Sequence, residues 1–285
     1  MRTAIITDSN SGIFQAEAEQ LGIYTVSMPV ILDGKTYYEG TTLRHETLYR
    51  LLEDGATVST SQPAPADVEK TWEQAFLDGY DEMVYIPMSS GLSSSLQTAK
   101  LLAEDYRGVV HVVDNHRISV TQRHAVLDAV QMAQKGNTGY CIKAHLEETA
   151  YLSLVYVGVQ DLTYLKQGGR ITAAAQTMGT LLKLKPLLVI QGDKLDAYAK
   201  VRGVRACQEK EIEAMQKYVQ RIKAAGWAVR ISASGSYANA AKATRWHNMV
   251  RAAFPGDEVT YDPLTCSIGC HVGPDAFGMG VSVCL

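Results

Sequence analysis

The sequence has little net charge, few cysteines and no long apolar run. Its 27 Lys and Arg residues stand against 30 Asp and Glu residues, a net charge of −3 with neutral histidines. That balance gives no general attraction to nucleic-acid phosphates. No run approaches the roughly 18 apolar residues that a membrane span needs. The N-terminal residues 1–8 resemble a strand rather than a secretion signal. We therefore expect no nucleic acid partner, no membrane span and a cytoplasmic location.

The cysteine content points to free thiols. The five cysteines are Cys141, Cys207, Cys266, Cys270 and Cys284. An odd number without a secretion signal is typical of a reducing cytosol. Cys266, Cys270 and His271 are close in sequence, but their spacing matches no common zinc signature. We therefore expect small buried thiols at these positions, with no metal and no cofactor.

Short β-branched runs alternate with helical stretches along the 285 residues, which are 46% hydrophobic and 20% charged. Strands are predicted at residues 3–6, 26–32, 36–38, 83–86, 109–113, 154–159, 187–190, 195–198, 228–233 and 281–283. Helices are predicted at residues 16–21, 43–52, 66–77, 93–106, 118–134, 140–150, 204–224 and 239–252, with others around Gly168–Arg170. This alternation predicts an α/β fold with two α/β domains, residues 1–150 and 151–285, and mostly parallel sheets.

A serine-rich loop, Ser89-Ser90-Gly91-Leu92-Ser93-Ser94-Ser95, follows one predicted strand and opens the next predicted helix. Free backbone N–H groups and hydroxyls at a helix start bind anions. Ordinary N-capping would account for one serine, not five. The loop therefore predicts an anion site, which a carboxylate or a phosphate could occupy.

Two further segments carry polar groups that suit a ligand. Thr60 and Ser61 precede a predicted helix, and we expect them at the carboxyl edge of the same sheet, where α/β proteins bind ligands. His271 lies in a glycine-dense segment, residues 267–274, where the backbone can approach a ligand closely. A purely structural histidine is the alternative. Arg170 and Arg202 each lie beside glycines, and the alternative for both is a solvated surface charge.

Nine short motifs occur in an order that covers essentially the whole chain. They are Thr7-Asp8-Ser9, Tyr37-Tyr38-Glu39-Gly40, Thr60-Ser61-Gln62-Pro63, Ser89-Ser90-Gly91-Leu92-Ser93, Val113-Asp114, Gly168-Gly169-Arg170-Ile171, Lys185-Pro186, Lys200-Val201-Arg202-Gly203 and His271-Val272-Gly273-Pro274. Together they resemble the DegV family of bacterial fatty acid-binding proteins. The resemblance implies two α/β domains with a ligand pocket between them.

The same resemblance implies a function. The better-studied members of that family are binding subunits of bacterial fatty acid kinase. They present the carboxylate of a long-chain fatty acid to a separate kinase catalytic subunit, which phosphorylates it with ATP for phospholipid synthesis. Such a chain is a lipid-binding subunit, not an enzyme, and it has no catalytic residue of its own.

The resemblance also assigns residues to the ligand and to the partner. Thr60 and Ser93 are the strongest candidates for binding the carboxylate. Ser61, Ser90, His271 and Gly273 complete the expected ligand site. Arg202 and Arg170 are expected to contact the kinase subunit.

The sequence departs from the family pattern in three places. The segment 265–270 lacks the usual threonine next to His271, Asp275 stands where a glycine usually follows Gly273-Pro274, and the third place is residues 115–123. Residues 115–123 are bulkier and more polar than the serine and glycines usual there. Gln122 and Arg123 would narrow the pocket if they face it, and would be surface variation if they reach solvent. Chain length and saturation of the ligand therefore do not follow from the resemblance.

Two other functions fit parts of the sequence. A serine hydrolase acting on acyl esters would use a serine near Ser90 with His271 and Asp8 or Asp114, although no G-x-S-x-G elbow is present. A sugar-phosphate binding protein or isomerase would use the serine-rich loop as a phosphate cradle.

Overall fold

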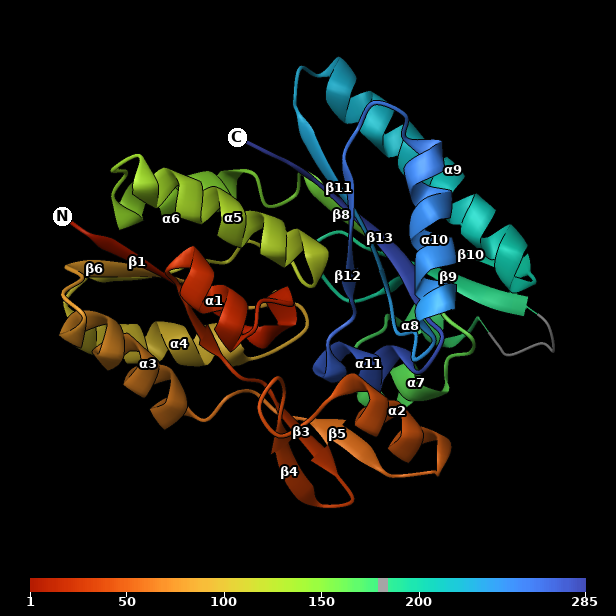
Figure 1. The fold of residues 1–285 in the computed structure, drawn as a ribbon, viewed down its shortest axis with the longest axis horizontal. Coiled ribbons are helices and arrows are strands. Elements are labelled where there is room, and N and C mark those ends of the chain that lie inside the picture. Colours follow the sequence, from red (N-terminus) through yellow and green to blue (C-terminus); the bar gives the residue numbers. More distant parts are fainter. Residues whose placement is uncertain (179–183) are drawn as a thin grey trace.

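The computed structural model describes residues 1–178 and 184–285. The described residues form a mixed α/β fold with three sheets, which confirms the predicted fold class (Figure 1). The small sheet lies beside the two larger sheets, at the bottom of the view in Figure 1. None of the helices in the described ranges combines the length and apolarity that a bilayer crossing needs.

The first sheet has the strand order β2-β1-β6-β7, and every pair in it is parallel. Its strands are β1 (Thr3–Asp8), β2 (Tyr24–Val26), β6 (Glu82–Ile86) and β7 (Val110–Val112). Helices α3 (Pro65–Leu77) and α4 (Ser95–Ala103) lie on one face, and α5 (Val120–Gln134) and α6 (Gly139–Glu148) on the other (Figure 1). Every residue of β6 is therefore buried, as in a parallel sheet covered on both faces.

The second sheet has the order β10-β9-β8-β13-β11-β12 and is mostly antiparallel. Its strands are β8 (Ser153–Gly158), β9 (Leu184–Ile190), β10 (Asp196–Arg202), β11 (Val229–Gly235), β12 (Val259–Pro263) and β13 (Phe277–Val283). Only β11 and β12 pair in parallel. The predicted parallel arrangement is wrong for this sheet because β13 runs antiparallel to both of its neighbours, β8 and β11, and β8 also pairs with β9 in antiparallel fashion. Helices α9 (Val204–Ala224) and α10 (Ala240–Ala253) pack on this sheet (Figure 1).

The third sheet has the order β4-β3-β5 and carries helix α2 (His45–Glu53) beside it (Figure 1). Its strands are β3 (Pro29–Leu32), β4 (Lys35–Tyr38) and β5 (Val58–Thr60). The single strand predicted at residues 26–32 is wrong, since β2 and β3 belong to different sheets. The Met28 N–H bonds the Ser9 hydroxyl at 3.0 Å, and Pro29 has no N–H to donate. Thr60 consequently lies in the small sheet, not in the first sheet as expected.

Several short helices complete the chain around these sheets. They are η1 (Ser9–Ser11), α1 (Gln15–Leu21), η2 (Glu104–Tyr106), α7 (Thr163–Gly168), α8 (Ala173–Gln176) and α11 (Cys266–Val272). The sequence predicts no helix where α11 forms. Helix α11 packs on β3 and β5, and α5 packs on β8, β11 and β13. The two halves of the chain therefore share extensive contacts, and a domain boundary at residue 150 stays a prediction.

Candidate ligand-binding site

A deep pocket lies between the first and second halves of the chain. It encloses about 880 Å³ free of protein atoms, including its open mouth. Its apolar lining residues come from both halves and include Met28, Met88, Leu92, Ile118, Val157, Leu165, Ile190, Leu195, Leu264, Val272 and Met279. Most of them belong to one buried hydrophobic cluster. An apolar chain inside this pocket would therefore contact side chains that are already removed from water.

The polar part of the pocket centres on Thr60 and His271. Thr60 Oγ1 lies 2.8 Å from His271 Nε2, within hydrogen-bond distance. Arg170 lies close by and donates from Nε to the Leu92 carbonyl at 3.3 Å, next to Ser93. A smaller cavity of about 340 Å³ shares Thr60, Arg170 and His271 with the main pocket. These three residues therefore form a wall that the apolar pocket shares with the smaller cavity.

His271 is neutral at physiological pH. Burial lowers its pKa to about 4, and the positive charge of Arg170 acts in the same direction. Gly168 packs against the ring, since a Cβ there would lie 2.1 Å from His271 Nδ1. The glycine at the end of α7 thus makes room for the imidazole. In the neutral ring, Nε2–H can donate to Thr60 while the threonine hydroxyl donates onward to a ligand.

The serine-rich loop contributes two lining residues, Leu92 and Ser93, so Ser93 is its one serine in the pocket wall. Ser93 Oγ accepts a hydrogen bond from the Ser95 N–H at 3.1 Å. Ser89, by contrast, is buried and donates to the Gly192 carbonyl at 2.7 Å. Ser90 is half-buried and lies outside the pocket lining, so it is not where the sequence analysis expects it.

The loop satisfies several of its own backbone donors. The N–H groups of Leu92 and Ser93 bond the Ser89 carbonyl, and the N–H of Gly91 bonds the Ser89 hydroxyl. These donors are consequently not free for a phosphate. The geometry supplies a hydroxyl to the pocket rather than the open amide cradle that the sugar-phosphate alternative needs.

The other predicted ligand residues divide into two groups. Ser61 is exposed and lines the pocket, with its N–H directed to the Pro29 carbonyl at 3.4 Å. Gly273 lies outside the lining and ends α11 with a φ of 75°, a conformation that favours glycine. Its carbonyl accepts a hydrogen bond from Ser236 Oγ at 2.6 Å. Gly273 therefore shapes the backbone after His271 and does not touch the pocket.

The two predicted partner residues occupy different environments. Arg202 is exposed at the end of β10, where it pairs with Leu184, and it lies outside the pocket. Arg170 is half-buried and lines both cavities. The structure thus places Arg170 beside the ligand site rather than on a solvated outer surface.

The segment 115–123 does not narrow the pocket through Gln122 or Arg123. Gln122 is fully buried and donates to Asp8 Oδ1 at 3.1 Å. Arg123 forms an ion pair with Glu17. Both side chains are held elsewhere, so the predicted steric role is wrong. From residues 117–123, the pocket wall takes only Ile118, Ser119 and Val120.

Neither aspartate that the hydrolase alternative requires, Asp8 or Asp114, bonds His271. Asp114 lies 3.8 Å from His116 Nε2 instead. Asp8 accepts hydrogen bonds from the N–H groups of Met88 at 2.8 Å and Asn10 at 3.0 Å, besides that from Gln122. Its carboxylate is therefore committed to the backbone of its own half. Among the described residues, His271 forms its hydrogen bond with the Thr60 hydroxyl and not with a carboxylate.

Residues that the sequence analysis did not assign surround the start of α11. Ser267 Oγ donates to Asn10 Oδ1 at 2.6 Å, and both residues line the pocket. Glu39 accepts a hydrogen bond from the Cys266 N–H, and its Oε2 lies 3.0 Å from the Ser267 hydroxyl oxygen. Burial raises the pKa of Glu39 to about 7. Its only signal in the sequence is its place in Tyr37-Tyr38-Glu39-Gly40, because two of its partners, Cys266 and Ser267, lie more than 220 residues away.

Fold and site together define an α/β protein with a ligand pocket between its two halves. The pocket wall is mostly apolar, and it carries a polar pair at Thr60 and His271. A family model described as "Uncharacterised protein, DegV family" matches residues 2–283. The chain belongs to the DegV family. A DegV domain-containing protein of Listeria monocytogenes is 31% identical over 289 residues, which cover 99% of each chain.

Solved structures of the same family are also similar. One is described as "Fatty Acid Binding of a DegV family Protein from Thermus thermophilus". It has a TM-score of 0.89 and 28% identity over 99% of this chain and 100% of that chain. A fatty acid-binding DegV family protein from Streptococcus agalactiae has a TM-score of 0.86 and 25% identity over 99% of each chain.

Proposed function

We propose that the chain binds one long-chain fatty acid, with its carboxylate at Thr60, Ser93 and His271. The observation that carries this proposal is the Thr60–His271 pair, set in the wall of an otherwise mostly apolar pocket. The fatty acid-binding relatives from Thermus thermophilus and Streptococcus agalactiae support the same ligand class.

The energetics of such a ligand agree with the lining. Each buried CH₂ contributes about 0.8 kcal/mol, so an acyl chain of roughly 16 carbons can offset the cost of ordering the ligand. Hydrogen bonds to a carboxylate contribute about 1.5–3 kcal/mol each. Neutral hydroxyl donors at Thr60 and Ser93, with His271 orienting the Thr60 hydroxyl, would hold the carboxylate without pairing it fully. The carboxylate would then stay nucleophilic.

We further infer that the bound fatty acid is presented to a separate kinase subunit in the cytoplasm. A carboxylate oxygen would attack the γ-phosphorus of ATP, forming an acyl phosphate and releasing ADP for a pathway to phospholipids. The chain would supply no catalytic group. The exposed Arg202 is available to a partner, and Arg170 lies in the wall that the ligand pocket shares with the smaller cavity.

Lipid extraction and mass spectrometry of the purified protein test the ligand class. We expect about one fatty acid per chain. The double variant Thr60→Ala, Ser93→Ala should weaken binding by several kcal/mol in total, less than additively if both hydroxyls share one oxygen. Ser94→Ala is the matched control, because Ser94 is exposed in the same loop and lies outside the pocket lining.

Three outcomes would contradict the proposal. Unchanged lipid occupancy in the double variant would show that the carboxylate lies elsewhere. A co-purifying sugar phosphate would favour the phosphate-binding alternative. Turnover of an acyl ester, lost in His271→Gln, would favour the hydrolase.

A further inference from the structure

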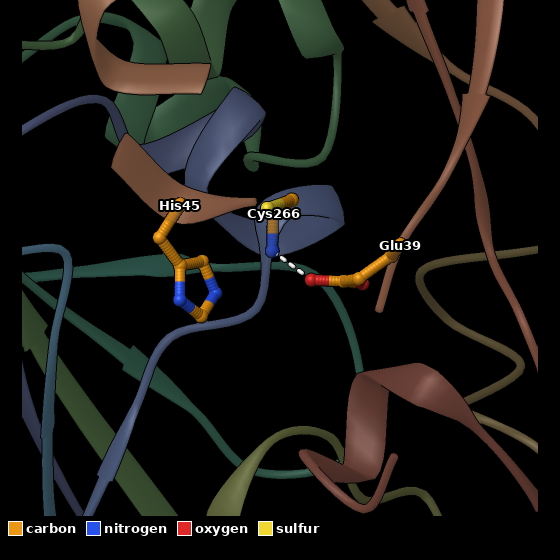
Figure 2. Close-up of side chains that lie close together, drawn as sticks. All are labelled: Glu39, His45 and Cys266. Atoms are coloured by element: carbon orange, nitrogen blue, oxygen red, sulfur yellow. Dashed lines mark hydrogen bonds between the residues drawn. The ribbon is translucent and has the colours of Figure 1, made fainter. Parts of the chain in front are cut away.

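A second group of reactive side chains lies outside the pocket, where three segments of the chain meet. Glu39 follows β4, His45 is the first residue of α2, and Cys266 is the first residue of α11. One oxygen, one nitrogen and one sulfur from these residues all lie within 4.8 Å of one another. Figure 2 shows the three side chains approaching one another. Among residues 1–178 and 184–285, no other set of His, Cys, Asp or Glu forms such a group.

His45 carries an unexplained buried atom. Its Nε2 is buried and has no hydrogen-bond partner among the described residues. Leaving such an atom unpaired costs about 1–3 kcal/mol, so native structures normally supply a partner such as water or an ion. Burial also lowers the pKa of His45. The ring stacks on Tyr49, which fixes its plane.

Glu39 and Cys266 direct an oxygen and a sulfur toward the same point as His45. The Glu39 carboxylate is oriented by the Cys266 N–H, the Ser9 hydroxyl at 3.2 Å and the Ser267 hydroxyl at 3.0 Å. Hydrogen bonds of this kind commonly orient carboxylates that bind metals. Burial and the nearby Glu39 raise the pKa of the Cys266 thiol. A cation between these groups would stabilise the charged form of both.

We propose that Glu39, His45 and Cys266 bind one zinc ion. Sulfur, imidazole nitrogen and carboxylate oxygen together suit Zn²⁺, whereas Mg²⁺ and Ca²⁺ prefer oxygen ligands alone. Zinc ligands at about 2.0–2.3 Å stand roughly 3.5 Å apart, so small side-chain rotations close the site. The Cys266 thiol loses its proton to solvent as the sulfur–zinc bond forms. A water molecule completes the fourth position.

The zinc ion would fix the start of the helix that serves the lipid pocket. Helix α11 begins at Cys266 and presents His271 to Thr60 near its other end. Ser267 also connects Glu39 to Asn10 in the pocket lining. The ion is therefore a structural link between the small sheet and α11. The assignment does not depend on the nature of the pocket ligand.

Cobalt titration tests the site in a Cys141→Ser background, which removes the exposed thiol of the chain. Chelator-treated protein should bind one Co²⁺ per chain with a thiolate-to-cobalt absorption band, and Zn²⁺ should displace it. Cys266→Ser should abolish the band, and His45→Ala should weaken binding at least tenfold. Protein purified without chelator should contain about one zinc per chain by elemental analysis.

Three kinds of result would overturn the proposal, two with cobalt and one with zinc. The first is the absence of a thiolate band with the Cys141→Ser protein at a moderate excess of Co²⁺. The second is an unchanged band in folded Cys266→Ser or unchanged affinity in folded His45→Ala. Circular dichroism establishes whether each variant is folded. Proton release on zinc addition to the Cys141→Ser protein gives a readout that needs no variant at the site, and its absence would also contradict the proposal.

Discussion

Thr60 Oγ1 and His271 Nε2 lie 2.8 Å apart although 211 residues separate them in sequence. Thr60 ends β5 of the small sheet, and His271 lies in α11 of the other half. Their hydrogen bond therefore exists only in the assembled fold. A neutral imidazole in this bond can orient the threonine hydroxyl toward a ligand.

Titration of His271 should not make fatty acid affinity depend on pH between 6 and 8. The pKa of His271 is about 4, so only about 1% of the ring is protonated at pH 6. An ordinary histidine would titrate near pH 6.5 and change the affinity across this range. Fluorescence titration with a long-chain fatty acid at pH 6, 7 and 8 measures the effect. An inflection near pH 6.5 in the wild type that is missing from His271→Gln would refute the depressed pKa.

Gly168→Ala should displace His271 and weaken ligand binding. The new Cβ would lie 2.1 Å from His271 Nδ1, and overpacking of this kind costs about 1–3 kcal/mol. We expect affinity to fall by about tenfold. Gly169→Ala is the control, since its Cβ meets nothing within 4 Å but its φ of 67° is strained for alanine. That control should lose about 1–2 kcal/mol of stability and keep its affinity. Equal affinities for the two variants would refute the packing argument.

Glu211→Gln should stabilise the fold at neutral pH. Glu211 is fully buried in α9, and burial raises its pKa well above the usual 4.5. Folding therefore keeps a proton on this group. The contribution of this proton to the stability of the fold is complete at pH values below the pKa of Glu211 in the unfolded chain. It is lost as the pH rises toward the pKa of Glu211 in the folded protein. Glutamine needs no proton, so the variant should be more stable at pH 7.5 by on the order of 1–3 kcal/mol.

The pH dependence separates this effect from a change in packing. The stability difference between Glu211→Gln and wild type should shrink when urea unfolding is repeated at pH 5. Glu209→Gln on the same helix is exposed and should stay within about 0.5 kcal/mol of wild type. A destabilised Glu211→Gln protein at pH 7.5 would show that Glu211 is not held in its protonated form.

Arg202→Ala should keep lipid binding and reduce phosphorylation by a fatty acid kinase subunit that acts with the wild-type protein. Arg202 is exposed and lies outside the pocket lining. Charges at the rim of an interface act mainly on association rate and specificity. Lys200→Ala, two residues earlier on the same exposed edge, controls for loss of charge alone. A parallel loss of lipid binding in Arg202→Ala would argue against a partner surface.

Local patterns were sufficient for much of the fold. The apolar run at β6 and the helical periods of α3, α5 and α9 are properties of neighbouring residues, so the sequence predicts them. The antiparallel second sheet is different, because strand direction depends on which distant strands pair. The insertion of β13 between β8 and β11 has no signal within residues 277–283.

The candidate site shows the same division. Hydroxyls and a histidine in predicted loops indicated Thr60, Ser93 and His271 as ligand-binding residues. The structure brings these three residues to one pocket. The sequence could not show that Arg170 faces the pocket, because its position depends on α7 packing beside α11. It could not separate Ser90 from Ser93 either, since both lie in one serine-rich loop and only backbone geometry distinguishes them.

The central position of β13 has a consequence for synthesis on the ribosome. This strand follows the other five of its sheet in sequence, yet it lies between β8 and β11. During translation those two strands emerge from the exit tunnel with no partner between them. Their edges stay open to wrong pairing until β13 arrives. Ribosome-bound nascent chains that end before residue 277 should therefore recruit chaperones, and chains extended past residue 283 by a linker longer than the tunnel should not.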